Sequence, residues 1–246
     1  MDTNIYKQSP GVVCRIGGFS CFVLLTYSLA TLLIMSITGG PPDDIEQTFS
    51  ILNENKFLGL LRLDLLTVFF IPFYYLLFYS LYIALKDTDP HVAMISLILA
   101  LAGTTLFLAT PSVFSYLQLS DRFAASGNDY ERNKLIAAGE AILVSDMWHG
   151  TGARIGGLLL QTGALLISIL MLRSTVFNRA TAITGIATHG LDLTHIIVGF
   201  FLPSLGNLFM FIAGPLYLIW FPMVGLRLYK LNFAQEQNHI STSIQP

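Results

Sequence analysis

Six long segments rich in Leu, Ile, Val and Phe constrain the fold of this chain more than any other feature of its sequence. A helix needs about 20 mainly apolar residues to cross a bilayer, and each of the six segments reaches that length. Charged residues make up only 11% of the chain, whereas they make up about 25% of a soluble domain. We therefore expect an integral protein of the cell membrane, with the lipid bilayer as its solvent. The segments span residues 16–38, 57–85, 92–119, 152–172, 180–203 and 205–228.

The apolar segments indicate helices rather than strands. Their apolar residues run continuously instead of alternating with polar ones, and each run is longer than a membrane strand of about 10 residues. The sequence therefore predicts an all-α six-helix transmembrane bundle. We assign residues 1–231 to a single integral membrane domain, and we expect the polar residues 232–246 to form a disordered tail. Pro111 and Pro215 lie inside predicted spans and each removes one backbone hydrogen bond, so we expect kinks there.

The long connection between the third and fourth spans, residues 120–150, contains a further predicted helix. Asn128 or Asp129 is a suitable cap, and acidic residues occupy the turn that follows. An apolar stripe along this amphipathic helix would place it on the outer membrane surface or over the mouth of the bundle. We therefore expect an extracytoplasmic helix between spans three and four. The stripe consists of Leu135, Ile136, Ile142 and Leu143.

The positions of Lys and Arg near the ends of the spans predict the orientation of the chain. Six crossings place both termini on one side of the membrane, and that side carries most of the basic residues in short connections. The opposite side has the acidic connection "GGPPDDIEQ" after the first span. We therefore expect both termini to be cytoplasmic. The basic residues on the predicted cytoplasmic side are Lys7, Arg15, Lys86, Arg173, Arg179, Arg227 and Lys230.

The stretch "THGLDLTH", residues 188–195, places three ionisable residues inside the fifth apolar segment. At about 100° per residue, His189, Asp192 and His195 fall within an arc of about 120° around a helix axis. The free energy of placing an ionisable side chain against lipid is unfavourable by roughly several kcal/mol. We therefore expect all three side chains to face the interior of the bundle.

Other ionisable residues fall at a similar predicted depth, in the outer half of the membrane. Two interpretations stay open: a polar cavity that binds a small molecule, an ion or a proton, and ion pairs that fix the helix register. In the second, Asp64 pairs with Arg154 and Arg62 with Asp192, or the reverse. The candidate residues of this polar cavity are Arg62, Asp64, His149, Arg154, His189, Asp192 and His195.

Cofactor binding is not predicted from these residues. His189 and His195 are separated by about 9 Å along a helix, too far to share one ion. His149, Asp192 and His195 are the remaining candidate metal ligands, and His149 with His195 is the one pair that could ligate a haem. The net charge of −2 argues against nucleic acid as a partner. Protein partners are left open.

The chain resembles the bacterial membrane family called domain of unknown function 4386 over about residues 15–231. The resemblance implies a multi-pass helical membrane protein and supplies no reaction and no catalytic residues. The stretch "HGLDLTH" is not part of the resembling pattern. The segments that carry the resemblance are "GGPPDDIEQTFSILNENKFLGLLRLDLL", "LSDRFAASGNDYERNKLIAAGEAILV", "HGTG", "MLRSTVFNRATAITGI" and "GPLYLIWFPMVGLRLYKL".

The expected function is that of a non-enzymatic membrane protein, either a transporter-like protein or a sensory or accessory component. The alternative is a membrane-embedded enzyme, a metal-assisted hydrolase ahead of a haem redox protein. No complete set of nucleophile, base and orienting group is recognisable in the sequence, which argues against the enzyme. No internal repeat is recognisable either, which argues against a transporter built from repeats.

Overall fold

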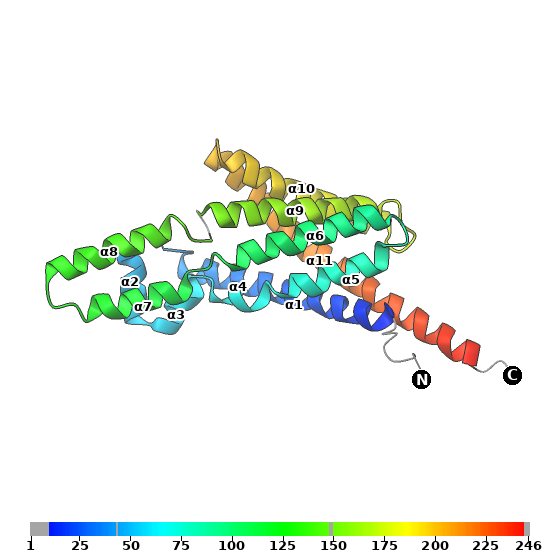
Figure 1. Ribbon diagram of the computed structural model, residues 1–246, viewed down its shortest axis with the longest axis horizontal. Helices are drawn as coiled ribbons and strands as arrows, with labels where there is room; N and C mark the ends of the chain where they lie inside the picture. The colour runs from blue at the N-terminus through cyan, green and yellow to red at the C-terminus, as the bar shows by residue number, and fades with distance from the viewer. Residues whose placement is uncertain (1–9, 43, 148–149, 244–246) are drawn as a thin grey trace, which may run out of the picture. The chain divides into compact units, whose positions relative to one another are not determined.

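The computed structural model describes residues 10–42, 44–147 and 150–243, with side chains up to Leu231. Over these residues the regular structure is entirely helical (Figure 1). The helices are α1 (Pro10–Thr38), α2 (Ile45–Glu54), α3 (Lys56–Arg62), α4 (Leu65–Phe70), α5 (Phe73–Leu85), α6 (Pro90–Leu108), α7 (Val113–Ala124), α8 (Asp129–Leu143), α9 (Thr151–Met171), α10 (Arg179–Gly199) and α11 (Pro203–Ser243).

The helices divide into two compact units. Among the described residues, the first unit contains residues 10–26, 73–103 and 158–243, and the second contains residues 27–42, 44–72, 104–147 and 150–157. The first unit therefore holds the beginning of α1, α5, most of α6, most of α9, and all of α10 and α11. The second unit holds the rest of α1 together with α2, α3, α4, α7 and α8.

Among the residues that the structure describes, five helical stretches are long and apolar enough to cross a membrane, which gives the chain the build of a multi-pass membrane protein. Helix α10 covers the fifth predicted segment and has 21 residues, but it is not among the five. Its two histidines, its aspartate and its threonines make it more polar than the others. The prediction of six spans thus stays open at α10. The five stretches are residues 11–38, 65–85, 90–124, 151–171 and 203–231.

The predicted single helix over residues 57–85 is wrong, because the structure has three shorter helices there, α3 and α4 in the first half and α5 in the second. Asp64 separates α3 from α4 because its backbone is left-handed, with φ 58° and ψ 45°. Pro72 lies between α4 and α5 and has no N–H to continue the helical ladder. Residues 45–54, predicted as a connection, form α2, whose first turn is capped by Asp44 accepting a hydrogen bond from Gln47 N at 2.7 Å.

Pro111 and Pro215, which lie inside two of the predicted spans, have different effects on the helices around them. Pro111, where we expected a kink, lies in a break between the end of α6 and the start of α7. Helix α11 instead continues through both Pro215 and Pro222 without a break. The missing N–H of a proline therefore ends one helix and is accommodated in the other.

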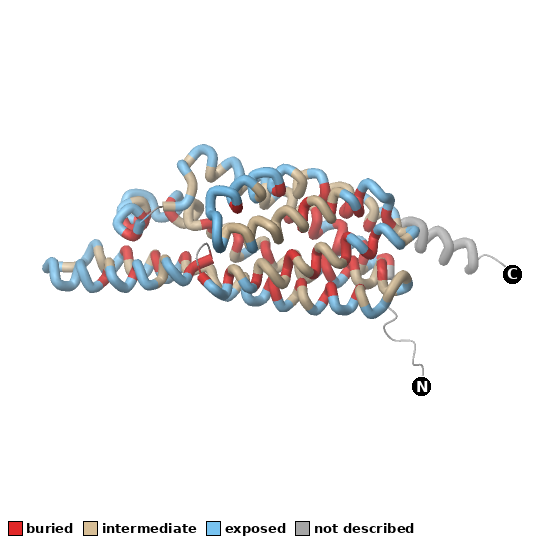
Figure 2. Tube along the Cα trace, turned by 90° about the horizontal axis from the view of Figure 1, so that it is seen from above, coloured by how far each residue is buried: buried red, intermediate tan, exposed pale blue. Residues whose placement is uncertain are grey.

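The first unit has an apolar core in which helices distant in sequence run antiparallel. The Ser80 hydroxyl of α5 donates to Val13 O of α1 at 2.7 Å. A Cβ added at Gly206 would lie 2.7 Å from Gly199 Cα, so glycine lets the end of α10 and the start of α11 approach closely. Figure 2 shows buried positions along the inner faces of these helices. Leu77, Phe78, Leu81, Trp220 and Phe221 are among the core residues.

The second unit has a smaller core beneath α8. Asn128 caps α8 by accepting a hydrogen bond from Glu131 N at 2.9 Å, which confirms the predicted start of this helix. The predicted stripe is also confirmed: Leu135 is buried, while Ile136, Ile142 and Leu143 pack against the core of this unit. That core consists of Ile45, Phe49, Leu52 and Tyr116.

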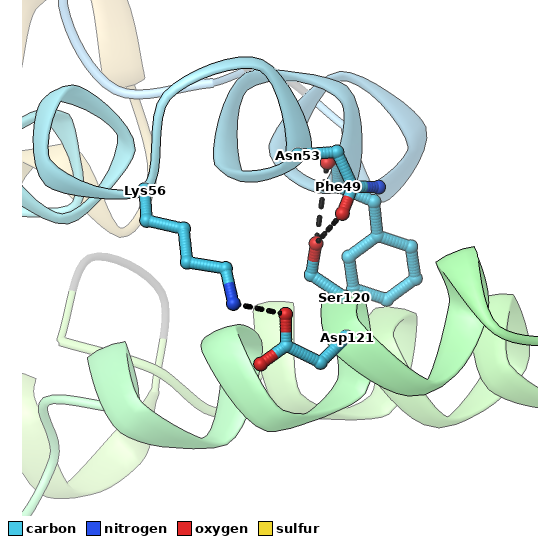
Figure 3. Close-up of polar contacts among 5 residues, drawn as sticks. All are labelled: Phe49, Asn53, Lys56, Ser120 and Asp121. Carbon is cyan, nitrogen blue, oxygen red and sulfur yellow. Dashed lines mark hydrogen bonds and ion pairs between the residues drawn. The ribbon is translucent and has the colours of Figure 1, made fainter.

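Polar contacts join α7 to α2 and α3 in the second unit (Figure 3). The buried Ser120 hydroxyl lies 3.2 Å from Phe49 O and 3.2 Å from Asn53 Oδ1. At the surface, Lys56 Nζ lies 2.6 Å from Asp121 Oδ1, and both side chains are about half exposed. Helix α7 thus makes a polar contact through the buried Ser120 with α2 and an open ion pair with α3.

Candidate functional site

Helix α10 places the "THGLDLTH" stretch against α9 and α11 in the first unit. The helix starts with a side-chain cap, because Asn178 accepts a hydrogen bond from Thr181 N at 2.8 Å. It then continues unbroken through His189, Asp192 and His195. His189 is 1% exposed. His189, Asp192 and His195 therefore lie about one turn apart on one continuous helix.

Asp192 is held by two neutral hydrogen-bond donors from neighbouring helices. Gln161 of α9 donates from Nε2 to Asp192 Oδ2 at 2.7 Å. Tyr217 of α11 donates its hydroxyl hydrogen to the same oxygen, also at 2.7 Å. Asp192 as a whole residue is only partly buried, and its carboxyl group is anchored by these two neighbouring helices.

Gln161 also fixes the hydrogen position on the imidazole of His189. Because the amide nitrogen of Gln161 donates to Asp192, its Oε1 faces His189, and His189 Nδ1 lies 2.9 Å from that oxygen. The oxygen can only accept, so Nδ1 must carry the hydrogen. His189 Nε2 is then left with a free lone pair, which makes it a hydrogen-bond acceptor.

Two buried nitrogens beside this network have no hydrogen-bond partner among the described residues. They are His189 Nε2, an acceptor, and Trp220 Nε1, a donor. The two rings are in contact, with centroids 4.5 Å apart and planes at 89°. Most buried polar atoms in proteins are hydrogen-bonded, so two adjacent exceptions require an explanation.

Gly185 allows the indole of Trp220 to lie against α10. A Cβ at residue 185 would come within 2.5 Å of both Trp220 Nε1 and Ser168 Oγ. Ser168 belongs to α9 and donates its hydroxyl hydrogen to Ala164 O at 2.7 Å. The indole N–H therefore lies near a hydroxyl oxygen without an assigned hydrogen bond to it.

His195 shares no hydrogen-bond partner with this network, but it lies close enough to Asp192 to interact with it electrostatically. Its Nδ1 is 3.0 Å from Gly206 O, at the turn from α10 to α11. The carbonyl oxygen can only accept, so Nδ1 of His195 carries a hydrogen. The structure thus turns all three ionisable residues of the stretch toward α9 or α11, but it joins only His189 and Asp192 through common partners.

Three other predicted cavity residues belong to the second unit. Arg62 Nε donates to Gly40 O at 2.9 Å, and Arg154 lies in the first turn of α9. Asp64 is 3% exposed and accepts hydrogen bonds from Thr67 Oγ1 and, at 3.4 Å, from the Tyr27 hydroxyl. The predicted ion pairs of Asp64 with Arg154 and Arg62 with Asp192 stay predictions.

A metal site has little support in the described part of the chain. Within residues 10–42, 44–147 and 150–231, no three His, Cys, Asp or Glu side chains are grouped as they would be around a metal ion. His149 lies outside the described residues. The predicted set of His149, Asp192 and His195, and the haem pair of His149 with His195, therefore stay untested.

Comparison with known proteins identifies a family. The sequence profile described as domain of unknown function (DUF4386) matches residues 16–225. This chain belongs to the DUF4386 family. No curated protein and no solved structure matches it.

The polar core of this DUF4386 chain includes three residues that the sequence analysis did not select: Gln161, Tyr217 and Trp220. Gln161 offered a signal, because it is an amide inside the apolar run "LLLQTG" of α9. Tyr217 and Trp220 lie among other aromatic residues of α11, and nothing in the sequence distinguishes them. Their roles become visible only when α9, α10 and α11 pack together.

Proposed function

We propose that this DUF4386 protein is a non-enzymatic, six-span protein of the cell membrane that binds a proton or a monovalent cation between α9, α10 and α11. Both termini are cytoplasmic in this proposal. The role is transporter-like, or that of a sensory component whose conformation follows the bound charge. No resident cofactor is part of the proposal. It is carried by the anchoring of Asp192, whose two hydrogen-bond partners are both neutral.

The proposal depends on how the negative charge of the Asp192 carboxylate is compensated. A carboxylate removed from water is costly unless a positive charge compensates it. Gln161 and Tyr217 stabilise the carboxylate by donating hydrogen bonds, but neither supplies a charge. The imidazole of His195, which interacts electrostatically with Asp192, supplies a positive charge only when it is protonated. A proton or a small cation arriving from solution would supply the charge directly. Asp192 keeps some exposed surface, so the packed helices do not enclose this residue completely.

The packing within the first unit supports α10 as the sixth span. Helix α10 is as long as α9, which is apolar enough to cross a membrane. It runs antiparallel to α11, since His195 pairs with Gly206 and His189 with Tyr217. Its polar side chains turn toward α9 and α11, which leaves a more apolar face for lipid.

The basic residues of the first unit support cytoplasmic termini. The beginning of α1 packs against α5 near Ser80 and against α11 near Leu228, and Arg227 donates to Val176 O in the α9–α10 connection. These segments therefore lie at one end of the unit, which Figure 1 also shows. An excess of basic residues marks the cytoplasmic side. The basic residues near this end are Arg15, Lys86, Arg173, Arg179, Arg227 and Lys230.

Cation binding is tested with Asp192→Asn, which removes the charge and keeps an oxygen acceptor. Asp121→Asn is the matched control, because it removes an exposed carboxylate from the second unit. We expect NaCl, KCl or a lower pH to raise the unfolding midpoint of the wild-type and control proteins relative to choline chloride, because a bound cation stabilises the folded state. Asp192→Asn should lose that response. The cation that acts identifies the ligand.

Vesicles give a second measurement of the same proposal. Proteoliposomes containing a pH-sensitive dye report proton movement when a membrane potential is imposed. A transporter carries protons or exchanges them for the cation in the wild type and fails to do so in Asp192→Asn. A binding response without flux favours the sensory role. Equal behaviour of wild type and Asp192→Asn in both measurements would rule out the proposed site.

Topology is tested with single cysteines in a background where Cys14 and Cys21 are replaced by Ala. The exposed positions Gly127, Thr175 and Lys230 are each changed to Cys. On intact cells, a membrane-impermeant maleimide should label residue 127 alone, and residues 175 and 230 only after permeabilisation. Labelling of residue 230 on intact cells would show that α10 does not cross the membrane.

A further inference from the structure

The partnerless nitrogens of His189 and Trp220 are complementary. Trp220 Nε1 carries a hydrogen and can only donate, whereas His189 Nε2 has a lone pair and accepts in the tautomer that Gln161 imposes. Both residues are almost completely buried, at 1% for His189 and 0% for Trp220. Their rings are packed edge to face, with centroids 4.5 Å apart. One donor and one acceptor thus lie unused beside each other in an apolar core.

The chemistry of a group that satisfies both nitrogens is restricted. It must accept a hydrogen from the indole and offer a hydrogen to the imidazole. A hydroxyl group does both through a single oxygen atom. A fully deprotonated anion has no hydrogen to offer to His189, and a cation without a lone pair cannot accept from the indole N–H. The aromatic surfaces of Tyr217 and Trp220, which flank His189, suit a carbon chain attached to that hydroxyl.

We propose that His189 Nε2 and Trp220 Nε1 together bind the hydroxyl group of a small, uncharged alcohol. This inference rests on the proposed function, because it assigns a second ligand, the solute, to the same three-helix core. Asp192 takes the charge, and the His189–Trp220 pair takes the neutral solute. Gln161 connects the two sites, since it bonds to Asp192 and sets the tautomer of His189. A free alcohol and a hydroxyl-bearing lipid present the same group.

Two simpler explanations compete with a solute. A resident water molecule would satisfy both nitrogens, because buried waters commonly bridge such groups. Alternatively, a small shift would let the indole N–H donate to Ser168 Oγ, which lies on the other side of Gly185. Either explanation closes the site. The experiment must therefore distinguish an exchangeable solute from a permanent partner.

The test uses the indole N–H signal of Trp220 in the nuclear magnetic resonance spectrum. The chain has two tryptophans, so Trp148→Phe leaves Trp220 as the single indole. Detergent-solubilised protein with ¹⁵N-labelled tryptophan is titrated with ethanol, and separately with acetonitrile, which accepts from the indole but cannot donate to His189. We expect a saturable displacement of the signal by ethanol and weaker binding of acetonitrile.

Two variants of His189 separate its two nitrogens. In His189→Asn the amide nitrogen takes the place of Nδ1, so the bond to Gln161 is kept while the acceptor at Nε2 is lost. We expect ethanol to bind roughly threefold to tenfold more weakly, as for the loss of one hydrogen bond. His189→Gln places an oxygen near the position of Nε2 and should recover much of the affinity.

The source of the hydroxyl is found by repeating the titration with lipid-stripped protein and diacylglycerol in mixed micelles. Saturation by diacylglycerol at far lower concentration than ethanol assigns the site to a lipid, and the reverse assigns it to a free alcohol. An indole signal that neither compound moves, or moves only linearly, overturns the inference and indicates a resident water. An indole signal that Ser168→Ala moves, without any ethanol response, indicates the bond to Ser168 and also overturns it.

Cation binding at Asp192 and alcohol binding at His189 and Trp220 can be refuted independently of each other. His189→Asn retains Asp192 and Gln161, so it should keep the cation response while weakening ethanol binding. If ethanol does not bind to the wild type, but the wild type and Asp192→Asn still differ in their response to cations, only the alcohol site is refuted. Ethanol binding in a protein whose stability ignores cations refutes only the charge-binding function.

Discussion

The two units each contain an aspartate bound to a tyrosine hydroxyl, but the two aspartates differ in what surrounds them. Asp192 lies in the unbroken helix α10, is half-buried, and takes its partners from α9 and α11. Asp64 lies at the break between α3 and α4, is 3% exposed, and accepts from Thr67 three residues ahead and from Tyr27 of α1.

The carboxyl group of Asp64 therefore helps to shape the backbone, whereas that of Asp192 has no such role and could bind a ligand. The oxygens of Asp64 bind a hydroxyl of the helix that follows it, while its left-handed backbone turns the chain. The carboxyl group of Asp192 shapes no turn, and its partner Gln161 leaves the imidazole of His189 with an open acceptor. The same residue type therefore indicates a structural role in one unit and a binding role in the other.

The largest effect that tests this comparison is expected at Asp64. A β-branched residue in the left-handed region is strained by about 1–2 kcal/mol, and lost hydrogen bonds to a charged group cost about 1.5–3 kcal/mol. Asp64→Val should therefore lower the free energy of unfolding by roughly 3 kcal/mol. The measurement is unfolding of the detergent-solubilised protein by sodium dodecyl sulfate.

Asp64→Asn is the control, because asparagine tolerates the left-handed conformation and keeps an acceptor. It should cost about half as much or less. If Asp64→Val and Asp64→Asn are equally stable, the backbone at Asp64 is not strained and the structural role assigned to this residue is wrong.

The next effect is expected at Gly185, where α10 meets Trp220 and Ser168. Gly185→Ala places a methyl group 2.5 Å from both Trp220 Nε1 and Ser168 Oγ. Overpacking of this kind costs about 1–3 kcal/mol. Gly190→Ala is the matched control in the same helix, because its Cβ would meet only Leu165 Cδ1, at 4.0 Å. That control should be neutral or stabilise by up to about 1 kcal/mol.

Thermal unfolding of both variants measures this pair. Equal stability of Gly185→Ala and Gly190→Ala would show that the indole is not held against α10. The donor of the proposed alcohol site would then not be fixed in place.

Much of the fold follows from the sequence because lipid imposes simple requirements on it. Length and apolar composition identified the membrane helices, and Asn128 with the apolar stripe identified α8. The break at Asp64 could not be predicted, because its carboxyl group is held by a tertiary partner, Tyr27 of α1, as well as by the nearby Thr67. The sequence around it has the apolar pattern of one continuous helix.

The candidate site was only partly predictable for a related reason. Spacing along α10 correctly placed His189, Asp192 and His195 on one side of the helix. Spacing within one helix contains no information about which residue of another helix lies opposite. Gln161 and Tyr217, which give His189 and Asp192 their hydrogen bonds, were therefore found only from the structure.

A smaller effect compares how strongly each tyrosine is coupled to its aspartate. The Tyr217 hydroxyl lies 2.7 Å from Asp192 Oδ2, whereas the Tyr27 hydroxyl lies 3.4 Å from Asp64 Oδ2. A double-mutant cycle of Asp192→Asn with Tyr217→Phe should give a coupling energy of about 1 kcal/mol. The cycle of Asp64→Asn with Tyr27→Phe should give clearly less. A reversed order would show that Tyr217 does not anchor Asp192.

The smallest effect is expected at the ion pair between Lys56 and Asp121 (Figure 3). Both side chains are about half exposed, and exposed ion pairs contribute about 0–1 kcal/mol. Lys56→Met should therefore change the free energy of unfolding by less than about 0.5 kcal/mol, with a smaller change at high salt. Ser120→Ala, in the adjacent sealed contact, should cost about 1 kcal/mol and be insensitive to salt. A larger and salt-sensitive loss at Lys56 would show that α3 depends on charge rather than on burial. In that case, exposure would not indicate how much a charged side chain contributes to stability. The comparison of Asp64 with Asp192, which rests on burial, would then need another physical basis.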